Sequence, residues 1–275
     1  MAICELLKIN DKQIIKKGQI LRNSEVLKKN HYILNAGAKN LDEILGGGFH
    51  SQTKYLIFGA NKTGKTQLCH QLCVQAYIQF LKIFEYPKQK KPEFIYYFDT
   101  ENTFRPERIN ELILNSEIEY QNLLSKILVS KIMSNSALLL SLKELENFLK
   151  LNEINILIID TLNNHFSSEL ANKNISSTKT KTIFLKILDK INQLTKDHNL
   201  ITITTAQVIS NLNRESSIRE IPAGNQLLNH YFSEYIYLDY KEQDKRYVQL
   251  INSLRLPEKR LLYKITSSGI QDYKL

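Results

Sequence analysis

A short run of small and polar residues has the spacing of a phosphate-binding loop. Residues 59–66 match the pattern G-x-x-x-x-G-K-S/T. The glycines let the backbone curl so that its N–H groups converge on an anion, and the helix that follows adds the positive end of its dipole. The Lys65 ammonium can reach the terminal phosphates of a nucleotide, and the Thr66 hydroxyl can ligate Mg²⁺. The predicted nucleotide contacts are Gly59, Ala60, Asn61, Lys62, Thr63, Gly64, Lys65, Thr66 and Gln67.

Three polar residues end three other apolar segments and could complete a hydrolytic site. Asp160 closes one segment, where a carboxylate can organise Mg²⁺; the alternative is an Asp that caps a turn. Glu101 follows a second segment and could orient and deprotonate an attacking water as a general base; otherwise it is an ordinary carboxylate at a strand end. Gln207 follows a third, where its amide could contact a γ-phosphate; the alternative is an unspecialised polar residue.

Strands and helices are expected to alternate along the chain and to position these residues. Apolar segments predict strands at 55–58, 94–98, 126–129, 154–160 and 200–205. Apolar residues at helical spacing predict helices at 67–80, 105–115, 138–149 and 184–194, and short strands are expected at 235–238, 247–251 and 261–265. This order predicts an α/β fold with a doubly wound, mostly parallel sheet and antiparallel strands at its C-terminal end. Ligands of such sheets bind beyond the carboxyl ends of the strands, so the candidate residues should converge there.

Two long polar connections, 161–179 and 208–224, are expected to be functional loops. Their cations suit sequence-independent contacts with the phosphates of DNA, with single strands favoured. The opposing interpretation is a pair of solvated connectors, because three glutamates dilute the positive charge. The predicted DNA contacts are Lys173, Lys179, Arg214 and Arg219.

Composition places limits on the class of protein. The 275 residues carry 37 Lys and Arg against 28 Asp and Glu, a net charge of +9 that is compatible with a polyanionic partner. The sequence predicts a basic N-terminal arm over residues 1–33 and one domain over 34–275. No membrane partner is expected, because no apolar run approaches the length of a membrane span. Three cysteines and no signal-peptide pattern favour a reducing compartment, the cytoplasm with its nucleoid or the nucleus.

Several segments together resemble the RecA-type recombinases, in particular the RadA branch of archaea and eukaryotes. Residues 63–70 are similar to that branch's phosphate loop, and residues 99–108 are similar to its DTEGTFRPER stretch, which is a very specific signature. Weaker similarities follow at its Walker B strand, its NQV segment, the end of its second DNA loop and its C-terminal cap, here residues 158–161, 206–208, 222–230 and 256–272. The resemblance spans residues 33–273.

The resemblance implies a RecA-like P-loop ATPase core that uses ATP and Mg²⁺, binds DNA and acts in homologous recombination and repair. Glu101 would be the catalytic carboxylate beside Lys65, Gln207 the γ-phosphate sensor, and Arg108 a neighbour of the adenine. ATP would lie between copies of the chain in a filament or ring, with Pro257 capping it from the neighbouring copy. The two long connections would be the DNA-binding loops.

The sequence also departs from that pattern. The helix-hairpin-helix N-terminal domain is expected to be absent, and no clear polymerisation motif precedes residue 33. Asn102, Asn225 and Asn252 replace a Gly, a Gly and a cap Asp of the pattern, and the short N-terminus is similar to that of RadB, an accessory archaeal paralogue. These departures favour a DNA-dependent ATPase that assists a full-length recombinase. The alternatives are an autonomous strand-exchange recombinase, an interaction protein latched by nucleotide with little turnover, and a RecA-fold ATPase outside recombination.

Overall fold

A computed structural model of the protein describes residues 31–81, 93–212, 218–242 and 245–273. The chain divides into two compact units, Met1–Tyr32 and Ile33–Leu275, and the elements named from here on belong to the second. The predicted basic arm, residues 1–33, lies almost entirely outside the described residues. The boundary between arm and domain therefore stays a prediction.

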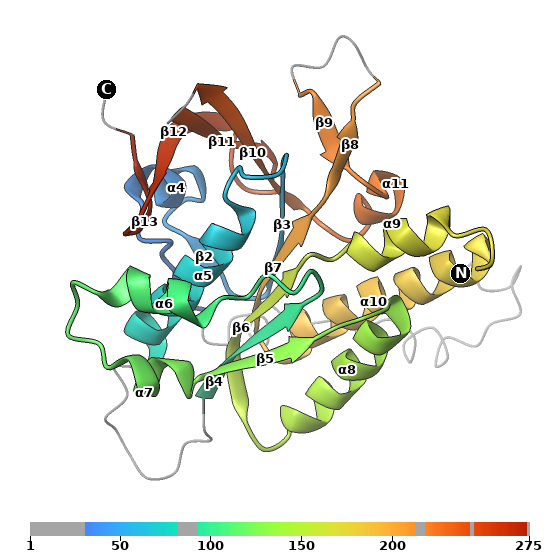
Figure 1. The fold of residues 1–275 in the computed structure, drawn as a ribbon, viewed down its shortest axis with the longest axis horizontal. Helices are drawn as coiled ribbons and strands as arrows, with labels where there is room; N and C mark the ends of the chain where they lie inside the picture. Colours follow the sequence, from blue (N-terminus) through green and yellow to red (C-terminus); the bar gives the residue numbers. More distant parts are fainter. Residues whose placement is uncertain (1–30, 82–92, 213–217, 243–244, 274–275) are drawn as a thin grey trace, which may run out of the picture. The chain divides into compact units, whose positions relative to one another are not determined.

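A nine-stranded sheet forms the centre of this unit (Figure 1). Its order is β5-β4-β6-β7-β3-β10-β11-β12-β13. The strands from β5 to β10 pair in parallel, and β11, β12 and β13 continue the sheet antiparallel. The bounds are β3 Thr53–Phe58, β4 Glu93–Asp99, β5 Ile127–Lys131, β6 Glu153–Asp160, β7 Ile201–Ala206, β10 Glu234–Glu242, β11 Lys245–Asn252, β12 Lys259–Thr266 and β13 Gly269–Asp272. The predicted fold class is confirmed.

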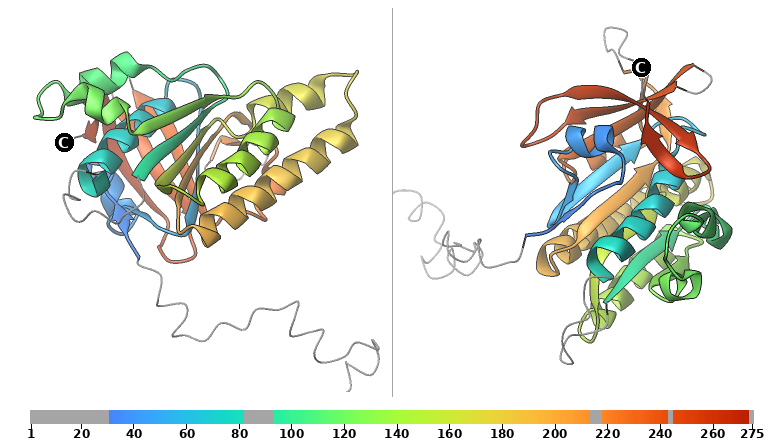
Figure 2. Two further views of the ribbon diagram at one scale, coloured as in Figure 1. Left: turned by 90° about the horizontal axis from the view of Figure 1, so that it is seen from below. Right: turned by 90° about the vertical axis from the view of Figure 1, so that its left-hand side faces the viewer.

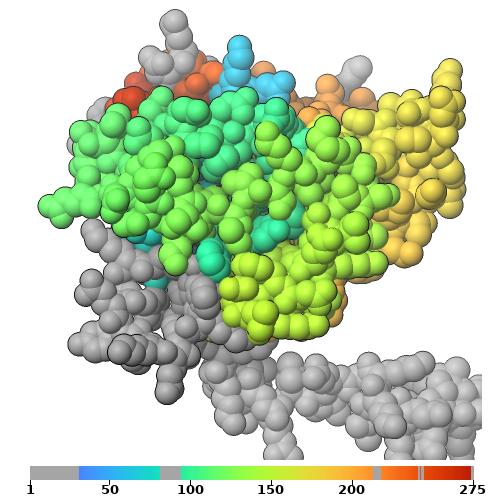
Figure 3. Space-filling model, turned by 60° about the horizontal axis from the view of Figure 1, so that its bottom comes forward, coloured from blue at the N-terminus to red at the C-terminus, as the bar shows by residue number. Residues whose placement is uncertain are grey.

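Helices cover both faces of the sheet (Figure 2). One face carries α5 (Lys65–Ala76), which continues as the π-helical turn η1 (Tyr77–Leu81), and α6 (Pro106–Ile113) packs on α5. On the other face α8 (Asn135–Phe148) lies beside α10 (Ser177–Asp197). Figure 3 shows the surface that α6, α7 (Tyr120–Leu124) and α8 form, with α9 and α10 beside it. The unit also contains the shorter elements α4 Lys39–Ile44, α9 Asn164–Ala171, α11 Asn225–Leu228, β1 Ile33–Leu34 and β2 Phe49–His50.

The main hydrophobic core lies between the sheet and the layer of α8 and α10. The two helices bury apolar residues that recur every three or four positions, as the sequence predicted. Each fully buried Leu, Ile or Phe contributes roughly 1.5–3 kcal/mol relative to exposure. The core therefore fixes the central strands, whose carboxyl ends carry the candidate site. These apolar residues are Leu138, Leu142 and Leu145 of α8 and Phe184, Ile187, Leu188 and Ile191 of α10.

The prediction of a loop over residues 161–179 is wrong, because α9 and the first turn of α10 occupy most of it. The ring of Phe166 stacks on that of Phe184 with centroids 4.1 Å apart, so α9 has an apolar side that holds it against α10. The Ser176 hydroxyl accepts a hydrogen bond from the backbone N–H of Lys179 and thereby caps α10. Only residues 172–176 connect the two helices.

The second predicted loop, residues 208–224, also contains regular structure. Strands β8 (Val208–Ser210) and β9 (Glu220–Pro222) pair antiparallel and make the stem of a hairpin. The strand signal in the sequence is weak here because each paired strand is only three residues long. Residues 213–217 of this connection lie outside the described part of the chain.

Among the helices that the structure describes, none combines the length and the apolar character that crossing a membrane requires.

Candidate nucleotide-binding and hydrolytic site

The carboxyl ends of β3, β4, β6 and β7 bring the candidate residues to one edge of the sheet. Phe58 pairs with Ala206, and Asp99 pairs with Asp160, so these parallel strands end level with one another. The phosphate-binding loop, Glu101, Asp160 and Gln207 each follow or end one of these strands. Each of them is hydrogen-bonded to a neighbour at this edge.

The phosphate-binding loop is held in a backbone shape that only glycine allows at its first position. Gly59 has φ +151°, and a Cβ there would lie 2.0 Å from the carbonyl oxygen of Leu238. Gly64, at φ +107°, is the N-cap residue of α5. The Lys65 ammonium donates to the carbonyl oxygens of Gly59 at 2.7 Å and Ala60 at 3.0 Å. The amine is thus folded back along the loop that it is predicted to serve.

Burial sets the electrostatics of this lysine. Burial lowers the pKa of Lys65, while the nearby carboxylates of Asp160 and Glu101 act in the opposite direction. A phosphate beside the ammonium would add a further negative charge and favour its protonated form. Of the other predicted contacts, Thr63 is buried and Asn61 and Lys62 are exposed at the turn of the loop.

Asp160 lies at the centre of a cluster of hydroxyl groups. It accepts hydrogen bonds from the hydroxyls of Thr66 and Tyr97, both at 2.8 Å, and from that of Thr205. Only 1% of its surface is exposed, and this burial raises the pKa of its carboxyl group, against the effect of the three hydroxyls. Carboxylate and hydroxyl oxygens suit Mg²⁺, so the pair Thr66 and Asp160 fits the predicted metal role by donor type and by proximity.

Glu101 and Gln207 are in direct contact although they follow different strands. The Gln207 side-chain amide donates to one carboxylate oxygen of Glu101 at 2.8 Å, and the Thr161 hydroxyl donates to the same oxygen at 2.7 Å. The predicted base and the predicted sensor therefore form one hydrogen-bonded pair. Thr161 was missed in the sequence; its only signal was that it follows Asp160 at the end of β6.

Asp99 fixes the turn that carries Glu101. Its carboxylate accepts the backbone N–H groups of Glu101 at 3.3 Å, Thr103 at 3.0 Å and Phe104 at 3.0 Å. Three backbone donors on one carboxylate leave the turn little freedom, so the position of the Glu101 side chain is set by its backbone.

His70 joins this turn to the phosphate-binding loop. Its Nε2 accepts the backbone N–H of Arg105 at 3.0 Å, so its Nδ1 carries the proton and donates to the carbonyl oxygen of Thr66 at 2.7 Å. Burial lowers the pKa of His70, which favours this neutral form. Nothing in the sequence indicates this role, because one His on a helix is usually a core residue.

Asn102 adopts the left-handed conformation, with φ +56°. Asn tolerates this region better than other residues with a Cβ, and Gly tolerates it freely. We expect Asn102→Gly to leave the free energy of unfolding within about 0.5 kcal/mol of wild type and Asn102→Ala to lower it by about 1 kcal/mol. Urea unfolding of the three proteins tests this, and an alanine variant as stable as wild type would contradict it.

Arg108 lies next to the first turn of α5. Its guanidinium donates to the Gln67 side chain at 2.6 Å and to the carbonyl oxygens of Thr266 at 2.8 Å and Ser267 at 2.7 Å. It also forms an ion pair with Glu111. The structure thus brings two predicted nucleotide contacts, Arg108 and Gln67, together.

Pro257 does not join the site of its own chain. It is exposed on the connection between β11 and β12. Because β11 runs antiparallel to β10 and Asn252 pairs with Tyr235, this connection lies at the edge of the sheet opposite the phosphate-binding loop. Pro257 could therefore cap ATP, as predicted, only where the ATP is bound to another copy of the chain.

Of the predicted DNA contacts that the structure describes, two lie where α9 gives way to α10 and one lies beside the β8–β9 hairpin. Lys173 is exposed between α9 and α10, and Lys179 is exposed on the first turn of α10. Arg219 is exposed beside β9, whereas Arg214 lies outside the described residues. Lys181 is a further exposed cation near Lys179 on α10; it lies outside the predicted loop, which ended at residue 179.

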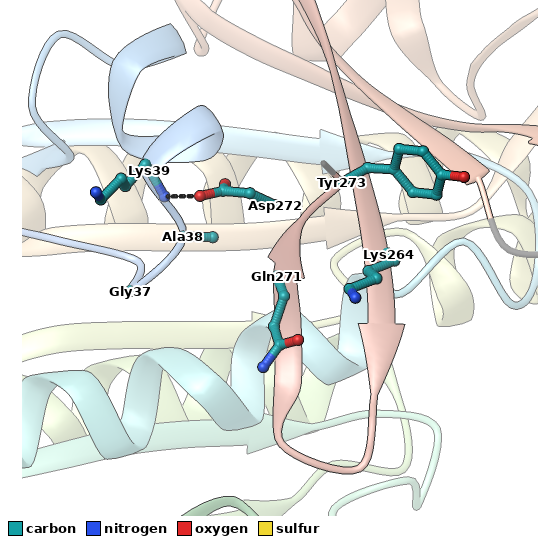
Figure 4. Close-up of a pocket in the computed structure, with 7 residues that line it drawn as sticks. All are labelled: Gly37, Ala38, Lys39, Lys264, Gln271, Asp272 and Tyr273. Atoms are coloured by element: carbon teal, nitrogen blue, oxygen red, sulfur yellow. Dashed lines mark hydrogen bonds between the residues drawn. The ribbon is translucent and has the colours of Figure 1, made fainter. Parts of the chain in front are cut away.

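A cavity of about 630 Å³ lies elsewhere, where α4 meets β12 and β13 (Figure 4). In it the Asp272 carboxylate accepts the backbone N–H groups of Lys39 at 3.2 Å and Asn40 at 2.8 Å, and so holds the start of α4. No residue that lines this cavity is among the predicted nucleotide or DNA contacts.

Comparison with known proteins assigns the family. The model of the Rad51 family matches residues 27–273. The DNA repair and recombination protein RadA of Methanococcus maripaludis strain C5 is 29% identical over 257 residues, which cover 90% of this chain and 79% of that protein. The RadA of strain C6 of the same organism is 28% identical over 246 residues, covering 87% and 76%. The chain therefore belongs to the Rad51 family.

Proposed function

We propose that this protein is a DNA-dependent ATPase of homologous recombination and DNA repair that assists a full-length recombinase. The observation that carries the proposal is the Glu101–Gln207 hydrogen bond, formed beside the Asp160–Thr66 pair at the end of the phosphate-binding loop. The names of the RadA relatives, which are DNA repair and recombination proteins, support the same assignment.

Each residue of the site has a part in the proposed reaction. The phosphate-binding loop and Lys65 would bind and orient the phosphates of ATP. Thr66 and Asp160 would hold Mg²⁺, which would neutralise charge on the phosphates. Glu101 would take a proton from the attacking water, and its hydrogen bonds from Gln207 and Thr161 would keep the carboxylate in place for that transfer.

The proposed partners follow from the exposed groups. Lys173, Lys179 and Arg219 would contact the phosphates of single-stranded DNA from connections that begin next to the hydrolytic residues. Pro257, at the opposite edge of the sheet, would serve a second copy of the chain or a recombinase partner. A protein with these partners would act where chromosomal DNA is held, at the nucleoid in the cytoplasm or in the nucleus.

One observation favours a second candidate, a nucleotide-latched interaction protein with little turnover. Glu101 is engaged by two donors, and one of them is the predicted γ-phosphate sensor. A contact of Gln207 with ATP would compete with that bond, so binding alone could change the position of the hairpin that follows.

ATP hydrolysis with and without single-stranded DNA separates the two candidates. We expect DNA to stimulate turnover, and we expect Glu101→Gln to lower kcat by about 10²–10⁴-fold with little change in KM, because only proton transfer is lost. The matched control is Glu107→Gln, a change of an exposed glutamate on the first turn of α6, which should behave as wild type. A Glu101→Gln variant that retains full DNA-stimulated hydrolysis would exclude the proposed base. Tight ATP binding without turnover in the wild type would favour the latch.

A further inference from the structure

Asn163 is a completely buried amide at the start of α9, just beyond the end of β6. Its side chain makes hydrogen bonds with both polar groups of the Gln207 backbone. The N–H of Gln207 donates to Asn163 Oδ1 at 2.8 Å, and Asn163 Nδ2 donates to the carbonyl oxygen of Gln207 at 2.9 Å. The backbone from which the predicted sensor extends is therefore held from both sides by one amide.

The same amide also reaches the far side of the β8–β9 hairpin. Asn163 Nδ2 donates to the carbonyl oxygen of Ala223 at 2.9 Å, and Ala223 N–H donates to the carbonyl oxygen of Gln207 at 2.9 Å. The hairpin leaves the site at Gln207 and returns at Ala223, so the Asn163 side chain is hydrogen-bonded to both ends of the hairpin. Asn163, the N-cap residue of α9, thus contacts the hairpin at both ends of its stem.

Packing around Asn163 adds a second link between the two connections. Gly224, which follows Ala223, has φ +81°, and a Cβ there would lie 2.9 Å from the Phe166 ring. Phe166 belongs to α9 and stacks on Phe184 of α10. The base of the hairpin therefore leaves no room for a side chain at Gly224 beside α9. Lys173 follows the end of α9, and Lys179 lies on the first turn of α10.

The neighbouring residue extends the network to the hydrolytic carboxylate. Asn164 Nδ2 donates to the carbonyl oxygen of Thr100 at 2.9 Å, in the turn that carries Glu101. Gln207 Nε2 in turn donates to Glu101 at 2.8 Å. Asn163 and Asn164 thus connect both candidate DNA-binding segments with the Glu101–Gln207 pair through hydrogen bonds of ordinary length.

We propose that Asn163 is a positioning residue that joins α9–α10 and the β8–β9 hairpin into one unit, so that DNA contact at either segment sets the position of Gln207 against Glu101. The inference rests on the proposed DNA-dependent hydrolysis and adds the element that transmits the DNA signal. Asn163 itself touches neither ATP nor DNA in this role. Its loss should uncouple the DNA response from the basal reaction. Lys65 donates to the carbonyl oxygens of Gly59 and Ala60, Asp160 accepts from Thr66, and Glu101 accepts from Thr161. None of these hydrogen bonds involves Asn163.

The first test compares DNA stimulation in Asn163→Ser and Asn163→Ala with that in wild type, using a single-stranded oligothymidylate. We expect both variants to keep basal ATP hydrolysis within about threefold of wild type and to lose DNA stimulation by about fivefold or more, the lower end of ordinary allosteric coupling. The serine variant retains a small polar group at this buried position, so the comparison can still be made if the alanine variant fails to fold.

The control for a general loss of buried polarity is Thr202→Val. Thr202 is equally buried on the neighbouring strand β7. It lies at the start of that strand, remote from Gln207, and its hydroxyl is hydrogen-bonded to that of Thr195 on α10. This variant should keep the full response to DNA. If it loses DNA stimulation as the Asn163 variants do, the effect is one of stability and the proposal is overturned.

A second measurement reads the coupling without turnover. Adenylyl imidodiphosphate with Mg²⁺ should slow amide hydrogen exchange in residues 161–179 of wild type and fail to do so in Asn163→Ser, while the phosphate-binding loop is protected in both. Equal protection of residues 161–179 in the two proteins, or equal DNA stimulation, would overturn the role of Asn163 and leave the proposed function standing. A wild type that hydrolyses ATP without any response to DNA would overturn both.

Discussion

Asp160→Asn is expected to lower the kcat of ATP hydrolysis by about 10²-fold or more while making the nucleotide-free protein at least as stable as wild type. The carboxylate is the only ionisable group that accepts the hydroxyls of Thr66, Tyr97 and Thr205 among the described residues. An amide can hold these hydroxyls, which rotate between donating and accepting, but it cannot replace a negative charge beside Mg²⁺. Loss of several kcal/mol of transition-state stabilisation corresponds to about 10²-fold or more in kcat.

The stability of this variant should also depend differently on pH. Burial raises the pKa of Asp160 above its unfolded value of about 4, so the folded state binds the proton more tightly than the unfolded state does. The contribution of Asp160 to the free energy of unfolding of wild type is therefore greatest below about pH 4. It declines as the pH rises through the pKa of the folded state. The amide introduced by Asp160→Asn does not titrate. In thermal unfolding scans the Tm of the variant relative to that of wild type should therefore increase as the pH rises. A variant that melts well below wild type at neutral pH would contradict this account.

Gly59→Ala is expected to remove nucleotide binding and to lower stability, whereas Gly47→Ala should have a much smaller effect. Both glycines have positive φ, +151° and +112°, so both substitutions impose backbone strain of about 1–3 kcal/mol. They differ in space, because a Cβ on Gly59 would lie 2.0 Å from the Leu238 carbonyl oxygen and one on Gly47 would have nothing within 4 Å. The phosphate-binding loop must therefore move away from β10 only in the first variant.

Fluorescent ATP-analogue binding and urea unfolding of the two variants measure this difference. We expect no saturable binding to Gly59→Ala at concentrations that saturate wild type, and near wild-type binding to Gly47→Ala. Equal losses in both variants would contradict the role given to the contact with the Leu238 carbonyl oxygen.

The sequence predicted the sheet and the convergence of the site because both depend on local patterns. Apolar runs mark β3, β4, β6 and β7, and parallel strands leave their polar terminal residues at one edge. The hydrogen bonds made by Thr161 and Asn163 depend instead on how turns from separate strands meet, which no spacing within one segment records. The helical state of residues 164–171 was missed for a related reason, since Phe166 gains its partner Phe184 only when α9 folds against α10.

One predicted nucleotide contact lies apart from the others for a topological reason. Pro257 follows an antiparallel strand, so the chain has already turned back to the edge opposite the phosphate-binding loop. The motif resemblance implied that Pro257 caps ATP from the neighbouring copy, and the sheet order is compatible with this because it places Pro257 away from the loop of its own chain.

The separation of Pro257 from the phosphate-binding loop would make an association between copies of the chain directional. An association in which the Pro257 connection of one copy meets the phosphate-binding loop of the next uses two different surfaces, and such contacts either close into a ring or continue without limit. In an open row of n copies, n − 1 nucleotide sites are complete and one terminal site lacks its cap, whereas a ring completes all n. ATP turnover per chain would then rise with the length of an open row and stay constant once a ring has closed.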